Sequence, residues 1–138
     1  GKLEQQPGHL IDIMATCVDV GGVKFPARFN GNQIIGLEGV SLRPTFSGKP
    51  LNRQDALYFE HHLNSAIRDG KWKLVRKGNT GKESKLFAWE LYDMSQDRSE
   101  LNNLADLHPQ KVTELAAKWE SWANRAHVKP WPWKISTD

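Results

Sequence analysis

The chain has 138 residues, of which 38% are hydrophobic and 25% are charged, as is ordinary for a globular domain. This length suits one modest core but not a large α/β enzyme sheet with a complete active site. The net charge of +3 comes from dispersed Lys and Arg, which excludes the basic run typical of a nucleic-acid partner. No apolar run approaches the roughly 18 residues of a membrane span, and no signal peptide is recognisable at the start.

An amphipathic helix is predicted over residues 9–20, ended by the glycine pair 21–22. Its apolar residues fall on one face at helical spacing: Leu10, Ile13, Met14, Cys17 and Val18. Cys17 is the single cysteine, so an internal disulfide is excluded. Its place on the apolar face predicts a buried structural thiol.

Residues 21–55 contain many Gly and Pro and show no clear periodicity, so they predict a long connector with one helical turn at 41–46. A loop of this length is unusual within a compact domain. We therefore expect it to cross the surface of something larger.

The second half predicts a small antiparallel sheet. Strands are expected at 56–60, 66–68, 72–76 and 85–93. Asp69-Gly70 between the second and third strands is a hairpin signal, in a loop that Lys71 can extend, and the polar residues 78–84 predict the next turn.

A long helix is predicted from Pro109 to about Ala126, because an apolar stripe at helical spacing follows a proline suited to the first turn. All six tryptophans lie in the second half, so we expect the packed core there, followed by an extended segment at 130–133. The fold class is therefore α+β, with about four antiparallel strands packed against one long C-terminal helix.

No complete catalytic or metal-binding motif is present: the sequence lacks a Gly-rich phosphate loop, a Cys/His cluster with ligand spacing and a Gly-x-Ser-x-Gly turn. The one dense polar cluster is Glu60-His61-His62-Leu63-Asn64, between two predicted strands. Histidine titrates near neutral pH and donates two hydrogen bonds when protonated, so this cluster is a candidate anion site. A solvated turn is the plainer interpretation.

Several segments resemble, in order, the end of the formylglycine-dependent (type I, arylsulfatase-like) sulfatase family. The similar segments are QPGHLIDIMATCVDVGGV (6–23), LEGVSL (37–42), YFEHHLNSAIRDGKWKLV (58–75), WELYDM (89–94), DRSELNNL (97–104) and the closing helix with its Pro130-Trp131-Pro132. Each segment is a weak signal alone, and their shared order and spacing carry the resemblance.

The resemblance implies that residues 1–55 are the end of a large α/β catalytic domain with its connector, and that residues 56–138 form the C-terminal subdomain. The parent would be a periplasmic or secreted sulfuric ester hydrolase that uses Ca²⁺ and a formylglycine made within Cys/Ser-x-Pro-x-Arg. Cys17 is followed by Val18-Asp19-Val20 and does not match that motif. The resemblance therefore implies an inactive fragment without catalytic or metal-binding residues, whose partners are the missing N-terminal catalytic domain and, in the parent, a sulfate ester.

In this family the turn EHEGNR approaches the mouth of the active site. His61 and Asn64 match its His and Asn, whereas His62-Leu63 and Ser65 depart from it. The resemblance thus implies His61, Asn64 and His62 as residues of the parent's substrate pocket.

Two other functions fit the sequence. One is a stand-alone anion- or carbohydrate-binding module that uses Trp131 and Trp133, and the other is an oligomerisation domain that self-associates through an exposed apolar surface. A broad exposed apolar face in residues 9–55 would favour the fragment, and a closed core with a deep pocket would favour the module.

Overall fold

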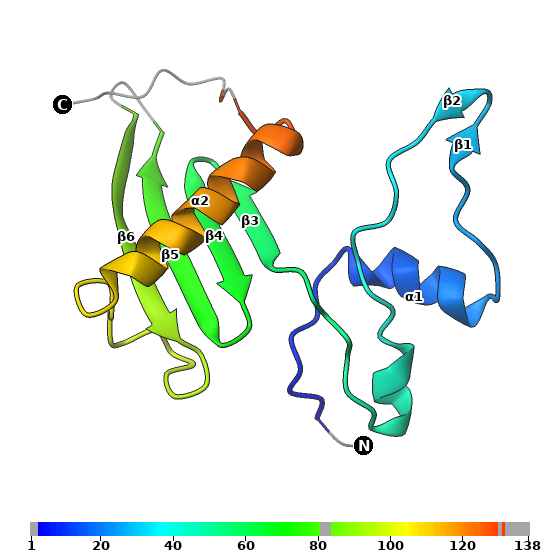
Figure 1. The fold of residues 1–138 in the computed structure, drawn as a ribbon, viewed down its shortest axis with the longest axis horizontal. Helices are drawn as coiled ribbons and strands as arrows, with labels where there is room; N and C mark the ends of the chain where they lie inside the picture. The colour runs from blue at the N-terminus through cyan, green and yellow to red at the C-terminus, as the bar shows by residue number, and fades with distance from the viewer. Residues whose placement is uncertain (1–2, 81–83, 130, 132–138) are drawn as a thin grey trace. The chain divides into compact units, whose positions relative to one another are not determined.

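The computed structural model describes residues 3–80, 84–129 and 131, and it divides into two compact units, Gly1–Gln54 and Asp55–Asp138 (Figure 1). The first unit contains α1 (Asp12–Val20), β1 (Arg28–Phe29), β2 (Asn32–Gln33) and the 3₁₀ helix η1 (Arg43–Ser47). The second contains β3 (Leu57–His61), β4 (Asn64–Asp69), β5 (Trp72–Asn79), β6 (Lys85–Asp93) and α2 (Pro109–Arg125). Trp133 and most of the predicted extended segment lie outside the described residues.

The second unit is a four-stranded antiparallel sheet in the order β3-β4-β5-β6, with α2 crossing one face (Figure 1). The ladder places Tyr58 beside Ile67, Ile67 beside Leu74, and Leu74 beside Leu91. Since alternate residues of a strand point to opposite faces, this row lies on one face of the sheet. The α+β prediction is confirmed.

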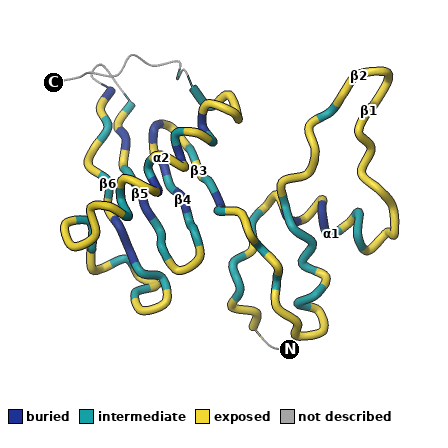
Figure 2. Tube along the Cα trace, in the orientation of Figure 1, coloured by how far each residue is buried: buried dark blue, intermediate teal, exposed yellow. Residues whose placement is uncertain are grey.

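The core of the second unit lies between that row and α2. Its fully buried members come from both layers: Ile67, Leu74, Leu91, Leu115, Trp119 and Ala123. Leu115, Trp119 and Ala123 recur every four residues, so one stripe of α2 enters the core. The indole nitrogen of Trp119 donates a hydrogen bond of 3.0 Å to the carbonyl of Phe59, which ties the helix to the edge strand β3. Figure 2 shows burial along the strands and α2.

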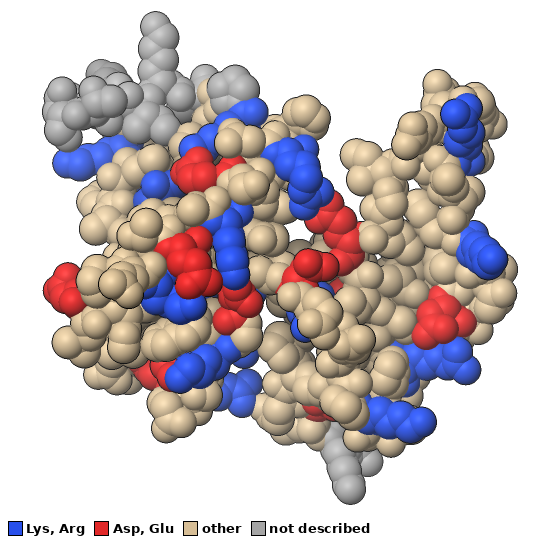
Figure 3. All heavy atoms as spheres, in the orientation of Figure 1, with Lys and Arg blue, Asp and Glu red and all other residues tan. Residues whose placement is uncertain are grey.

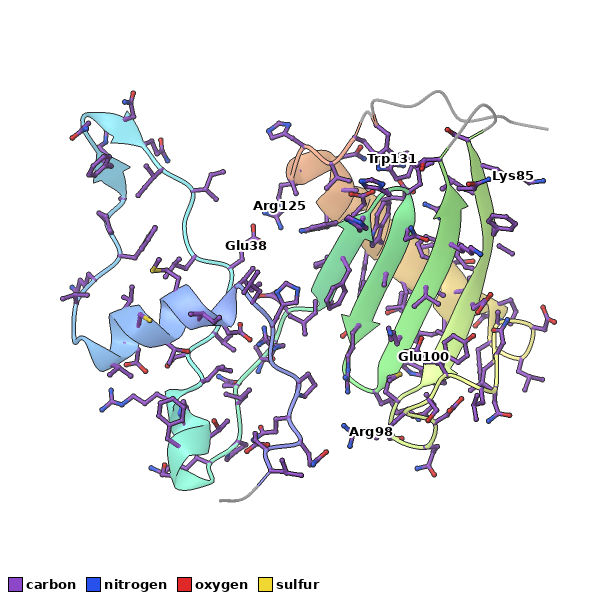
Figure 4. All side chains as sticks on the ribbon, turned by 180° about the vertical axis from the view of Figure 1, so that it is seen from behind. Glu38, Lys85, Arg98, Glu100, Arg125 and Trp131 are labelled. Carbon is purple, nitrogen blue, oxygen red and sulfur yellow. The ribbon has the colours of Figure 1, made fainter. Side chains whose placement is uncertain are left out.

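Aromatic rings extend this core, as the tryptophan distribution predicts. The guanidinium carbon of Arg76 lies 4.2 Å from the ring centroid of Trp89 and 5.6 Å from that of Trp119. Burial lowers the pKa of Arg76, and Glu120 partly opposes that change. Trp131, labelled in Figure 4 near one end of the sheet, packs against the same group of rings.

The first unit is held by a buried carboxylate instead of an apolar core. Asp12 is fully buried, and its two oxygens accept hydrogen bonds from the amide of His9 (2.7 Å), the amide of Val40 (3.0 Å) and the guanidinium of Arg53. These contacts join the start of α1 to two distant points of the connector.

Two further polar residues on α1, Thr16 and Asp19, also bind the connector, and together with Asp12 they form a polar seam between the helix and the connector. The hydroxyl of Thr16 accepts a hydrogen bond from the amide of Leu42 (2.9 Å). Asp19 accepts one from the hydroxyl of Ser41 (2.6 Å), which with Arg43 holds the pKa of Asp19 below its ordinary value. Because residues 12, 16 and 19 recur at helical spacing, the connector packs along a polar face of α1.

The apolar face of α1 is consequently exposed. Leu10 is 77% exposed, Ile13 55% and Met14 54%, and Cys17 is exposed as well. The prediction of a buried Cys17 thiol is therefore wrong. Among the described residues of the first unit, Ala15 is the single buried hydrophobic residue.

The connector is more structured than predicted. β1 and β2 form a hairpin around Asn30 and Gly31, whose φ angles of 48° and 81° are those of a type I′ turn. The predicted helical turn is confirmed as η1, although it begins two residues later than expected.

One turn of the sheet lies where predicted and one differs. Asp69 pairs with Trp72, so the second hairpin turns at Gly70 and Lys71, within the predicted loop. β5 continues through Gly78 to Asn79, so Gly78 belongs to a strand and not to the predicted turn.

Trp119 gives a direct test of this core. Trp119→Ala should lower the free energy of unfolding by about 3–5 kcal/mol, because it removes a fully buried ring and its hydrogen bond to β3. Urea unfolding of the 138-residue chain measures this, and Leu101→Ala, at a side chain that is 80% exposed, is the control. A loss within about 0.5 kcal/mol, as expected for an exposed position, would contradict the assignment.

Candidate functional site

The candidate site is the turn that joins β3 to β4. His61 pairs with Asn64 at the end of the ladder, so His62 and Leu63 are the two turn residues. Their φ angles are 50° and 69°, the left-handed values that a type I′ turn requires. Glycine and asparagine usually occupy such positions, and a residue with a larger side chain costs roughly 1–2 kcal/mol there.

Polar contacts hold this turn from inside. The carboxylate of Glu60 accepts a hydrogen bond from the amide of Leu63 (2.9 Å). The side-chain nitrogen of Asn64 donates to the carbonyls of His61 (2.9 Å) and His62 (3.3 Å), and its oxygen accepts from the amide of Gly78 (3.2 Å). The Asn64 amide therefore fixes the turn to β5, and its predicted part in a substrate pocket stays a prediction.

The two histidines are exposed at this turn, and their rings stack with centroids 4.4 Å apart and an interplanar angle of 20°. Each imidazole offers at least one N–H donor, and a protonated imidazole offers two together with a positive charge. The pair can therefore donate hydrogen bonds to an anionic oxygen.

His61 lies on the sheet face opposite α2. Tyr58, which stacks on Trp122 of α2, points to the helix side, so alternation places Phe59 and His61 on the other side. Phe59 is 40% exposed and pairs with Ala66, which in turn pairs with Val75. This open face, defined as Phe59, His61, Ala66 and Val75, joins an apolar row to the histidine.

The predicted site residues thus meet at one turn, while other surface features lie elsewhere. Hollows beside His108 and beside Arg43 include none of them. Lys and Arg alternate with Asp and Glu on the face shown in Figure 3. Within residues 3–80, 84–129 and 131, no group of three or more His, Cys, Asp or Glu could hold a metal ion.

Sequence reasoning missed the structural part of the site. Leu63 is fully buried, and Gly78 of β5 lies directly opposite it. The sequence signal for this close contact is an isolated glycine inside a strand pattern, which often marks a close backbone approach.

Comparison with known proteins gives two curated relatives of far greater length. The chain is 34% identical over 113 residues to an uncharacterized sulfatase of Schizosaccharomyces pombe, covering 80% of this chain and 20% of the relative. It is 27% identical over 118 residues to arylsulfatase K of Xenopus laevis, covering 81% and 21% respectively. The chain therefore spans about a fifth of the length of these relatives. No protein-family model matches it.

Solved structures show the same fold. One, described under the metabolism of multiple glycosaminoglycans by Bacteroides thetaiotaomicron, has a TM-score of 0.60 and 24% identity, covering 82% of this chain and 24% of its own. Another, in complex with its substrate D-glucosamine-2-N,6-O-disulfate, has a TM-score of 0.57 and 24% identity, covering 86% and 24%.

Proposed function

Because this chain is a sulfatase-family sequence spanning about a fifth of its curated relatives, we propose that it is the C-terminal part of a sulfuric ester hydrolase. In this proposal it packs on a larger catalytic domain and contributes its histidine turn to the substrate pocket. The parent acts on a sulfate ester and is periplasmic or secreted. The helices among the described residues include none that is long and apolar enough to cross a membrane.

The observation that carries this proposal is the exposed apolar surface of the first unit. It consists of side chains just before α1, on it and just after it: Leu10, Ile13, Met14, Val20 and Val23. Apolar surface of this kind marks an interface, since burying it contributes roughly 25 cal/mol per Å². The other four fifths of the relatives' length offers an occupant of suitable size, so we assign this surface to the rest of the parent chain.

The open face of the second unit supports the same arrangement. Phe59, Ala66 and Val75 form an apolar row that α2 leaves uncovered, and His61 lies at its end. A partner that covers this row would meet the histidine turn. In that position His61 and His62 would donate hydrogen bonds to the oxygens of a sulfate group, whose negative charge strengthens such bonds.

The calcium ion and formylglycine implied by the resemblance do not fit this chain. Its described residues contain no group of three or more His, Cys, Asp or Glu that could hold a metal ion. Cys17 is not followed by the x-Pro-x-Arg sequence within which formylglycine is made. We therefore place both in the remainder of the parent and assign no catalytic residue to this chain. In this proposal the chain's own residues bind and orient the sulfate group of the substrate.

The interface can be tested with the rest of the parent expressed as a separate polypeptide. Ile13→Asp should weaken the complex with this chain about tenfold or more, because a carboxylate would be buried in an apolar interface. Sedimentation velocity measures the complex, and Leu101→Asp, at an exposed leucine of the second unit, is the control. Equal binding by Ile13→Asp would contradict the interface, and a homodimer that Ile13→Asp dissociates would favour the oligomerisation domain.

The histidine turn can be tested in the full-length parent. His61→Ala should lower kcat/KM for an aryl sulfate about tenfold to a hundredfold, because a hydrogen bond to a charged substrate group contributes about 1.5–3 kcal/mol. The control is His127→Asn at another exposed histidine with a positive φ of 55°, a conformation that Asn tolerates. Unchanged turnover and KM in His61→Ala would contradict the role.

A further inference from the structure

We infer that Leu63 and Gly78 are positioning residues for the anion-binding histidine pair, an inference that rests on the proposed role of the turn. Leu63 is the anchor, because its buried side chain fixes the turn to the sheet, and Gly78 is its seat, because it leaves the space that Leu63 occupies. Together they hold His61 and His62 in the stacked, exposed arrangement.

The conformation of Leu63 needs a compensating interaction. A leucine with a φ of 69° is strained, and the preceding His62 has a positive φ as well. Complete burial of the Leu63 side chain removes its apolar surface from water, and this gain is of the same order as the cost of one residue with a left-handed φ. The burial of Leu63 therefore offsets strain in the turn that carries the histidines.

Gly78 makes that burial feasible. Continuing the register of Ser65 with Arg76 by two residues brings Leu63 opposite Gly78. A Cβ atom on residue 78 would lie 2.3 Å from the Cβ of Leu63 and 2.5 Å from its carbonyl oxygen. Both are atoms that cannot rotate away, so only glycine fits this position.

The seat also fixes the orientation of the turn. The amide of Gly78 donates to the Asn64 oxygen, while the Asn64 nitrogen holds the carbonyls of His61 and His62. The backbone of both histidines is thus connected through Asn64 to the strand on which Leu63 rests. A rigid donor pair loses less conformational entropy on binding an anion than a mobile pair does.

The anchor and an ordinary turn role predict opposite results for one substitution. Leu63→Gly relieves the strained φ, so a residue that served only the turn would be replaced without loss. If Leu63 is an anchor, the same change frees the turn and disorders the histidine pair. Gly78→Ala should act in the same direction by displacing Leu63.

The test uses NMR of the 138-residue chain with labelled histidine, titrated with inorganic sulfate. The wild-type chain should show an NOE between the His61 and His62 rings and sulfate-dependent shifts of both. Leu63→Gly and Gly78→Ala should abolish the NOE and raise the sulfate midpoint about fivefold to tenfold, as expected for a displaced binding group. Gly36→Ala, at an exposed glycine with open space around its Cα, is the matched control and should change neither.

The outcomes separate the two proposals. A ring NOE and a sulfate midpoint unchanged in folded Leu63→Gly would overturn the anchor. Wild-type histidine signals that do not respond to sulfate would overturn the anion-binding role, and the NOE comparison would still decide whether Leu63 positions the rings.

Discussion

The core cluster of buried apolar residues lies in the second unit, and the rest of the structure depends on this difference between the two units. In the second unit, leucines of the sheet and Trp119 of α2 exclude water from a continuous core. In the first unit the corresponding contribution comes from Asp12, a buried carboxylate that binds two amides and Arg53. A buried ion pair orders the chain around it but contributes little net stability, because both charges lose water. The first unit therefore gains little from apolar burial within its described residues.

The exposed apolar face of α1 is the reason why we propose that the chain is part of a larger protein. The seam along Asp12, Thr16 and Asp19 places the connector on one side of α1 and leaves the apolar side open. The second unit repeats the pattern, since α2 covers one sheet face and the face bearing His61 stays open. In our proposal the rest of the parent chain covers both open surfaces. The substrate's sulfate ester would then lie at the histidine turn.

Local patterns predicted the secondary structure of this chain better than its packing. Apolar periodicity located α2 and β6, and the resemblance to sulfatases agrees with the relatives found by comparison. The same periodicity misplaced Cys17, because it identifies the apolar face of a helix without saying what covers it. The β1–β2 hairpin was not predicted, although Asn30-Gly31 is a pair typical of such turns. The burial and positive φ of Leu63 could not be predicted from the sequence. They depend on Gly78, fifteen residues away, which lies opposite Leu63 only in the folded sheet.

Amide hydrogen exchange of the isolated 138-residue chain tests the central claim most directly. Exchange rates report local opening, so a unit with few buried apolar contacts exchanges well before the global core. We predict that the amides of Leu74 and Leu91 exchange slowest, and that those of α1 exchange at least about 100-fold faster, with protection restored by the rest of the parent. Protection of α1 equal to that of β5 in the isolated chain would show a self-sufficient first unit and contradict the account.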